Sequence, residues 1–267
     1  MKKLLILLCF ISFKLSAQLG YYPSNGGVGA GMGNCMVADQ SYASIFGNQA
    51  GLAFLKQPSI ALYGERRYFL SALNGFGAGY AHPTNSGTFL IKAQYFGYNA
   101  YNEQQIGVGY ARKFLDNLSV GIQINYQGFN IQDYGSRGTF SFEAGLQYLI
   151  NNNFAIGFQI INPIAVKITE NDYLQSVYKT GLSWKASKLL TINAEVEKSQ
   201  NFDLRFKGGI NYKIMDQFYL RTGIKTNPTE YCFGAGFIVS QKFLFDIAGT
   251  YHQILGISPT LGVNYQF

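Results

Sequence analysis

The sequence predicts an all-β protein: a transmembrane antiparallel β-barrel of about 14 strands with a glycine-rich N-terminal plug. Three observations predict it: an export signal at the N-terminus, an alternation of apolar and polar residues from residue 59 onward, and an unusual composition. Only 13% of the 267 residues are charged, whereas 16% are aromatic and 31 are glycine. After residue 17 no apolar run approaches the roughly 20 residues that a transmembrane helix needs.

Residues 1–17 have the pattern of a cleavable signal peptide. A short basic start, Met1-Lys2-Lys3, is followed by the apolar stretch 4–13 and by small residues up to Ala17. Cys9 lies within the apolar stretch and follows Leu8, so we do not expect it to be lipidated. The pattern predicts an exported protein whose mature chain begins near residue 18.

The segment 59–267 repeats a unit of about ten alternating residues and a turn. In the stretch 118–126, for example, Leu, Val, Ile, Ile and Tyr alternate with Ser, Gly, Gln and Asn. A soluble sandwich would also alternate, but the large apolar positions are too numerous for one core, and a lipid-facing exterior around a polar lumen explains both faces. The expected strands are 59–65, 68–82, 86–97, 103–114, 117–129, 138–150, 153–161, 176–186, 189–198, 203–214, 217–225, 230–241, 243–251 and 257–267.

The connections between these strands fall into a short and a long class. Short turns are expected at 83–85, 115–116, 151–152, 187–188, 215–216 and 242, and longer loops at 98–102, 130–137, 162–175, 199–202, 226–229 and 252–256. Short periplasmic turns, longer outer loops and an even strand number are typical of barrels in the outer membrane of Gram-negative bacteria. The region 63–73 could be a hairpin or an interrupted strand, so 12 or 16 strands remain alternatives. Tyr265 and Phe267 end the last strand, and a terminal phenylalanine there is typical of chains delivered to the barrel-insertion machinery.

Residues 18–58 do not alternate, and this stretch is the predicted plug. Glycines are concentrated at its start, among them Gly29, Gly31 and Gly33, and the stretch that follows is rich in small residues. Glycine permits close approach of one backbone to another, so we expect this segment to pack inside the barrel.

Two motifs within the predicted plug carry a resemblance. The run 29–34 reads Gly-Ala-Gly-Met-Gly-Asn, and Asn48, Ala50, Gly51 and Leu52 match an Asn-Pro-Ala-Gly-Leu core in which Gln49 replaces the proline. These residues resemble the N-terminal hatch of FadL-type outer-membrane barrels, and more closely the PorV and PorQ proteins of the Bacteroidota type IX secretion system. The resemblance implies a plugged barrel.

We weighed three functions. The main hypothesis is a non-enzymatic scaffold subunit of a large outer-membrane complex for protein secretion or assembly, with outer-membrane or periplasmic proteins and membrane lipid as partners. The alternative is a FadL-like channel for small hydrophobic molecules. An enzyme finds no support, because the two histidines, His82 and His252, are expected at opposite ends of the barrel. No metal or cofactor is expected.

Charged residues on the predicted lumen face are the remaining candidates. They are Glu195, Glu197, Arg205, Lys207 and Arg221. They could form a constriction that selects a solute or ion pairs inside a filled barrel; the numerous lumen glycines favour ion pairs. Without the three lysines of the signal peptide, 18 basic residues face 14 acidic ones, a formal charge of +4 that is too mild to suggest nucleic acid.

The mature chain retains two cysteines, Cys35 in the predicted plug and Cys232 on an expected inward face. A disulfide between plug and wall is conceivable in an oxidising compartment, but two buried thiols are the simpler expectation.

Overall fold

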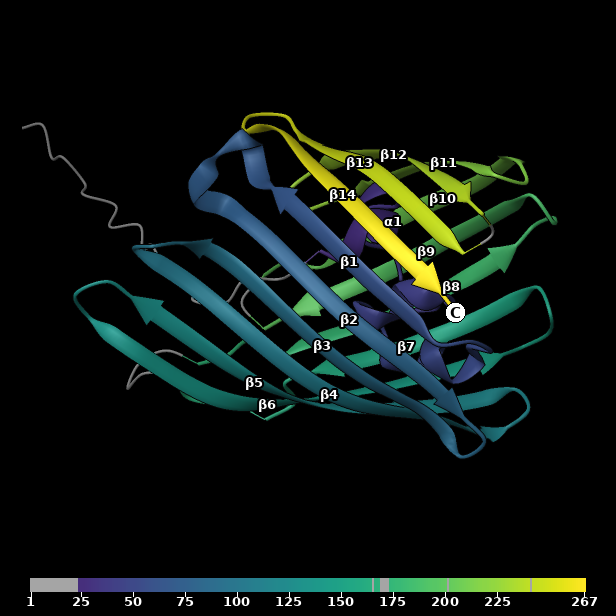
Figure 1. The fold of residues 1–267 in the computed structure, drawn as a ribbon, viewed down its shortest axis with the longest axis horizontal. Coiled ribbons are helices and arrows are strands. Elements are labelled where there is room, and N and C mark those ends of the chain that lie inside the picture. Colours follow the sequence, from purple (N-terminus) through teal and green to yellow (C-terminus); the bar gives the residue numbers. More distant parts are fainter. Residues whose placement is uncertain (1–23, 165, 169–172, 201, 241) are drawn as a thin grey trace, which may run out of the picture.

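A computed structural model describes residues 24–267 apart from 165, 169–172, 201 and 241. The predicted signal peptide, 1–17, and the first predicted plug residues, 18–23, lie outside the described residues. Fourteen antiparallel strands close into a barrel in which each pairs with its neighbours in sequence and β14 pairs with β1 (Figure 1). The predicted fold class and strand number are therefore confirmed. The strands are β1 (Ser59–Arg66), β2 (Asn74–Thr84), β3 (Gly87–Tyr98), β4 (Tyr101–Leu115), β5 (Leu118–Ile131), β6 (Gly135–Leu149), β7 (Phe154–Ile161), β8 (Val177–Lys185), β9 (Leu190–Ser199), β10 (Arg205–Met215), β11 (Phe218–Lys225), β12 (Glu230–Val239), β13 (Phe243–His252) and β14 (Gly256–Gln266).

The start of the second strand differs from the prediction of 68–82. Residues 67–73 instead form two short 3-10 helices, η3 (Arg67–Phe69) and η4 (Ser71–Leu73). Tyr68 and Phe69 have φ angles of 53° and 57°, a left-handed conformation that interrupts an extended strand. A pattern of side-chain polarity does not report that backbone turn.

Two of the predicted long loops are also wrong. β3 and β4 pair up to Tyr98 and Tyr101, leaving only 99–100 between them, and β5 and β6 leave only 132–134. The ladder between β5 and β6 ends at Ile131 opposite Gly135, whose φ of 90° permits the tight turn. Of the connections that were predicted to be long, 162–176 is the longest in the structure.

The outer surface of the barrel is apolar around its whole circumference. Ile106, Phe140 and Leu261 are 55%, 60% and 60% exposed, whereas lumen-facing polar residues such as Gln123 and Asn125 are buried. A closed sheet satisfies its backbone hydrogen bonds internally, so it can present this belt to lipid. The chain is thus a barrel of the outer membrane of a Gram-negative bacterium. We call the rim with Ser59 and Phe267 the inner rim, and the opposite one the outer rim.

Residues 24–58, the N-terminal segment, lie inside the barrel (Figure 1). The segment contains α1 (Gly26–Gly31) and the 3-10 helices η1 (Tyr42–Ile45) and η2 (Gln49–Phe54). Ser41 and Asn48 begin the 3-10 helices, their side-chain oxygens accepting the N–H of Ala43 and Ala50. Among the described residues, no helix is both long and apolar enough to cross a membrane.

Candidate functional site: the lumen and its N-terminal segment

The outer half of the lumen holds a cavity of about 660 Å³. Its walls carry charged side chains of both signs and several aromatic rings, and its floor belongs to the N-terminal segment. The floor residues are Ser24, Asn25, Ala30 and Asn34. This outer cavity is therefore closed from below by the segment.

A second cavity, of about 260 Å³, lies on the inner side of the same segment. Val28, Met32 and Asp39 of the segment line it, together with strand residues near the inner rim such as Phe154. The segment lines both cavities and therefore lies between the outer and the inner half of the lumen.

The glycines of the predicted plug motif allow the segment to approach the wall. A Cβ on Gly31 would lie 3.3 Å from the Cα of Gly234 in β12, and one on Gly33 would lie 3.1 Å from the carbonyl oxygen of Ile224. Gly33 also has a φ of 65°, which favours glycine. Gly29 instead faces its own segment, where a Cβ would overlap that of Asn25. Two of the three glycines thus form the contact with the wall.

The motif that follows pins the segment to β6 and β7. The Asn48 amide donates to the carbonyl oxygens of Val37, at 2.7 Å, and Phe158, at 3.1 Å. A side chain on Gly51 would overlap the carbonyl oxygen of Asp39, and Leu52 is fully buried. Ala50 is fully buried as well, and its N–H donates to the Asn48 side chain at 3.1 Å.

Gln49, which departs from the proline of the related motif, bonds to the wall. Its side chain accepts a hydrogen bond from Gln159 at 3.2 Å and donates to the carbonyl oxygen of Gly121 at 3.4 Å. A proline could make neither bond. The substitution therefore replaces backbone rigidity with polar contacts.

One side of the segment packs against β1–β4 mainly through apolar side chains, with one hydrogen bond from the Thr88 hydroxyl to the carbonyl oxygen of Leu52 at 2.9 Å. We call this contact the apolar seam; its buried residues are Ile45, Phe46 and Leu52 of the segment with Ala61, Tyr63, Ala81, Leu90 and Ala111 of the wall. Phe46 and Tyr63 meet edge to face with ring centroids 4.8 Å apart. At the inner end, the Lys113 ammonium lies 4.6 Å from the centroid of the Phe54 ring.

Sequence reasoning missed this seam. Its signal was present, because the inward positions nearest the inner rim in β1–β4 carry alanine and leucine, among them Ala81, Leu90 and Ala111. A second clue was the apolar pair Ile45-Phe46. It precedes the first lipid-facing strand, so its side chains are expected to pack inside the barrel.

The opposite side of the segment is held by buried charges, which we call the ionic side. Glu195 accepts the backbone N–H groups of Met36 and Val37, both at 2.9 Å, through one carboxylate oxygen. Its other oxygen lies 2.8 Å from the Lys207 ammonium, which also lies 2.6 Å from Glu197.

The structure brings four of the five predicted lumen charges into this network. Arg205 completes it by pairing with Glu197 at 2.9 Å. Arg221 stands apart and pairs with Asp246 of β13, a residue that sequence reasoning did not select. Opposite charges on neighbouring strands compensate each other in the low dielectric of a filled lumen.

The two cysteines are free and buried. The Cys35 thiol donates to the carbonyl oxygen of Lys207 at 3.7 Å, and Cys232 lies 3.6 Å from the Thr250 hydroxyl. Burial raises the pKa of the Cys35 thiol, so the thiolate that would react is disfavoured.

The chain ends beside its first strand. The N–H of Phe267 donates to the carbonyl oxygen of Pro58 at 3.1 Å, and the rings of Tyr265 and Phe267 meet with centroids 4.9 Å apart. His82 lies near this rim in β2, whereas His252 ends β13 at the outer rim. The histidines do not share a site.

No family model and no curated protein matches this chain. Solved structures do match its fold. The Pseudomonas putida toluene transporter TodX is 10% identical with a TM-score of 0.72, covering 91% of this chain and 99% of that one. The Ralstonia pickettii toluene transporter TbuX is 11% identical, with a TM-score of 0.69 and coverages of 91% and 98%. A Pseudomonas aeruginosa FadL homologue is 12% identical, with a TM-score of 0.69 and coverages of 92% and 99%.

These matches correct the main functional hypothesis. The structures that share this fold are transporters, which contradicts the scaffold subunit of a secretion complex and agrees with the alternative of a channel. The resemblance to PorV and PorQ gains no support from these matches, which are to toluene transporters and a FadL homologue. At these identities the likeness establishes architecture: the chain has the fold of the FadL-type outer-membrane barrels.

Proposed function

We propose that this protein is a channel for small hydrophobic molecules across the outer membrane, with the N-terminal segment as its plug. One observation carries the proposal: the segment that lies between two lumen cavities is held by buried charges on one side and mainly by apolar packing, with a single hydrogen bond from Thr88, on the other. The shared fold with two toluene transporters supports the same solute class.

The apolar seam offers the route. The seam's wall residue Tyr63 lies two positions nearer the inner rim than Glu65, which lines the outer cavity. The inner end of the seam reaches the half-buried Ala53 and Leu55. Packing contacts lack direction and can be re-formed around an apolar guest, whereas a buried ion pair loses its partner when it opens. A hydrophobic solute could therefore pass between segment and β1–β4 while the ionic side holds.

The test is uptake of radiolabelled toluene by a Gram-negative host that lacks its own FadL-type channels. Expression of this chain should raise the uptake rate, and the rate for a small sugar should stay at the level of the empty host. Toluene uptake equal to that of the empty host, with folded barrel present in its outer membrane, would contradict the proposal.

A further inference from the structure

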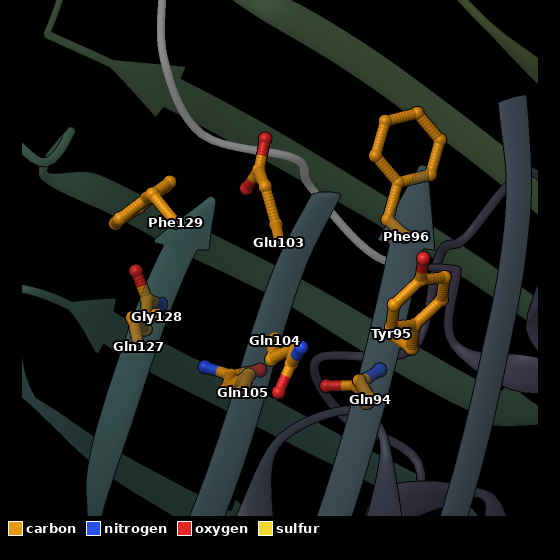
Figure 2. A pocket seen from close by; sticks show the side chains of 9 residues that line it. All are labelled: Gln94, Tyr95, Phe96, Glu103, Gln104, Gln105, Gln127, Gly128 and Phe129. Carbon is orange, nitrogen blue, oxygen red and sulfur yellow. The ribbon is translucent and has the colours of Figure 1, made fainter. Parts of the chain in front are cut away.

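Carboxamide side chains line two cavities of very different size. The smaller one, of about 20 Å³, lies in the wall beside the outer cavity, and its lining includes Gln94, Gln105 and Gln127 (Figure 2). That volume suits a single water molecule. The inner cavity, of about 260 Å³, has room for roughly nine water molecules and is close to the roughly 300 Å³ of a small ligand pocket. The inner cavity therefore has the size of a binding site.

Three adjacent strands present a grid of polar side chains to the inner cavity. Ser183 of β8 lies opposite Asn193 of β9. Two residues nearer the inner rim, Lys185, Thr191 and Asn211 stand side by side on β8, β9 and β10. Neighbouring strands lie about 4.8 Å apart, so these five side chains form two rows of hydrogen-bonding groups on one wall.

Most groups of this grid are not bonded within the protein. Among the residues that the structure describes, the side chains of Ser183, Lys185 and Thr191 make no hydrogen bond, although Ser183 is only 8% exposed. The Asn193 amide donates to the carbonyl oxygen of Cys35 at 2.9 Å. Its own oxygen, like that of Asn211, has no partner in the described part of the chain. Buried polar groups are normally hydrogen-bonded, so an unbonded set around a cavity indicates a polar ligand.

The facing wall of the cavity belongs to the N-terminal segment. Val28, Met32 and Ala38 make part of it apolar. Asp39 lies beside them, and it and Lys185 are the charged residues of the described lining, one of each sign. Because these charges balance, the cavity favours a ligand without net charge. Its polar and apolar walls favour a ligand that has a polar and an apolar face.

We propose that the inner cavity binds one ring of a neutral sugar. Hydroxyl groups both donate and accept hydrogen bonds, so a sugar ring can bond to hydroxyl, amide and ammonium groups together. An amine without hydroxyls only donates, and a carboxylate only accepts. The C–H face of the ring lies against Val28 and Met32 in this arrangement.

The ligand enters from the periplasmic side. Asn152 and Asn153, which are exposed in the β6–β7 turn at the inner rim, line the cavity. The sugar therefore reaches its site without crossing the barrel. The site faces β8–β10, away from the apolar seam, and it does not rest on the channel function proposed above.

The test is equilibrium dialysis of the full barrel, purified in detergent, against radiolabelled glucose and against maltotetraose. We expect saturable retention. Tighter retention of glucose identifies a free monosaccharide as the ligand, and tighter retention of maltotetraose identifies the end of a longer glycan. Trp184, the only tryptophan of the sequence, stacks on Phe154 with ring centroids 5.5 Å apart, and Phe154 lines the cavity. Its fluorescence should change with the same saturation curve.

The variant Ser183→Ala/Thr191→Val removes two cavity hydroxyls with little change of shape. It should weaken retention about tenfold or more, because two hydrogen bonds to the sugar are lost. Ser141→Ala/Thr180→Val is the matched control: it makes the same substitutions at residues that do not line the inner cavity, and it should bind like the wild type.

A second cavity variant guards against loss of folding in the first. Asn152→Ala/Asn153→Ala changes only the exposed turn, and it should also weaken retention. No saturable retention of either sugar by the wild type, or cavity variants that bind as tightly as the wild type, would overturn the proposal.

Discussion

The two sides of the N-terminal segment contact the barrel through different interactions. Against β1–β4 the segment offers Ile45, Phe46 and Leu52 to an apolar group of wall residues that contains no charge. Against β9 and β10 it offers backbone N–H groups to Glu195, which Lys207 neutralises. The first contact can yield to an apolar guest, and the second is directional and costly to break. A plug built in this way would move on one side and stay anchored on the other.

The largest effect should follow from removing the anchor's cation. Lys207→Met leaves Glu195 and Glu197 buried without their shared partner, which should destabilise the seated segment by about 3–5 kcal/mol. The readout is labelling of Cys35 by a thiol reagent in a Cys232→Ser background, which should accelerate at least about a hundredfold. Adding Glu195→Gln and Glu197→Gln should restore part of the protection; an unchanged labelling rate in Lys207→Met would show that the ionic side is no anchor.

A truncation in the apolar seam should weaken seating and raise transport. Leu52→Ala removes a fully buried side chain, a change that costs about 2–5 kcal/mol where the site cannot collapse. Toluene uptake should increase, because the seam then opens more often. Leu261→Ala, on the lipid-facing surface, is the control and should leave uptake unchanged; equal behaviour of the two variants would argue against a route through the seam.

The smallest effect concerns pH. Burial raises the pKa of Asp39, against hydrogen bonds from Ser41 and Ser44 and the charge of Lys185, which lower it. The seated segment therefore binds a proton at Asp39 more tightly than the released segment does. The protonated carboxyl stabilises the seated state at pH values near and below the ordinary pKa of 3.8, and this stabilisation is lost as pH rises through the raised pKa. Labelling of Cys35 with a dithiodipyridine reagent, taken as the ratio of wild type to Asp39→Asn, should rise with pH over that window. A flat ratio would contradict the assignment.

The barrel could be predicted closely from sequence because its signal is periodic. Side-chain alternation identifies strands and faces, and it found all 14 strands, but it does not register a backbone turn such as that at Tyr68 and Phe69. The lumen charges were found for the same reason, since the strand neighbours Glu195 and Lys207 follow from register alone.

The contacts of the segment were beyond sequence reasoning. Which wall faces Ile45 and which faces Met36 depends on how an irregular chain folds within the barrel, and no periodicity encodes that. The function was misjudged for a related reason. Its evidence was a motif that describes how a plug is built, and plug architecture is shared by proteins with different tasks.

Two engineered cross-links test most directly whether solutes pass on the apolar side. Ile45→Cys/Gly79→Cys ties the segment to the wall at the apolar seam, where a Cβ on Gly79 would overlap the Ile45 side chain. Gly31→Cys/Gly234→Cys ties it at the ionic side beside Arg221, where a Cβ on Gly31 would lie 3.3 Å from the Cα of Gly234 and one on Gly234 would lie 3.1 Å from the Cα of Gly31. Both pairs are made in a Cys35→Ala/Cys232→Ala background, and toluene uptake is measured before and after reduction. We expect the oxidised seam lock to abolish uptake until it is reduced and the ionic-side lock to leave uptake intact. Uptake that survives the seam lock, or that is lost only with the ionic-side lock, would contradict the account.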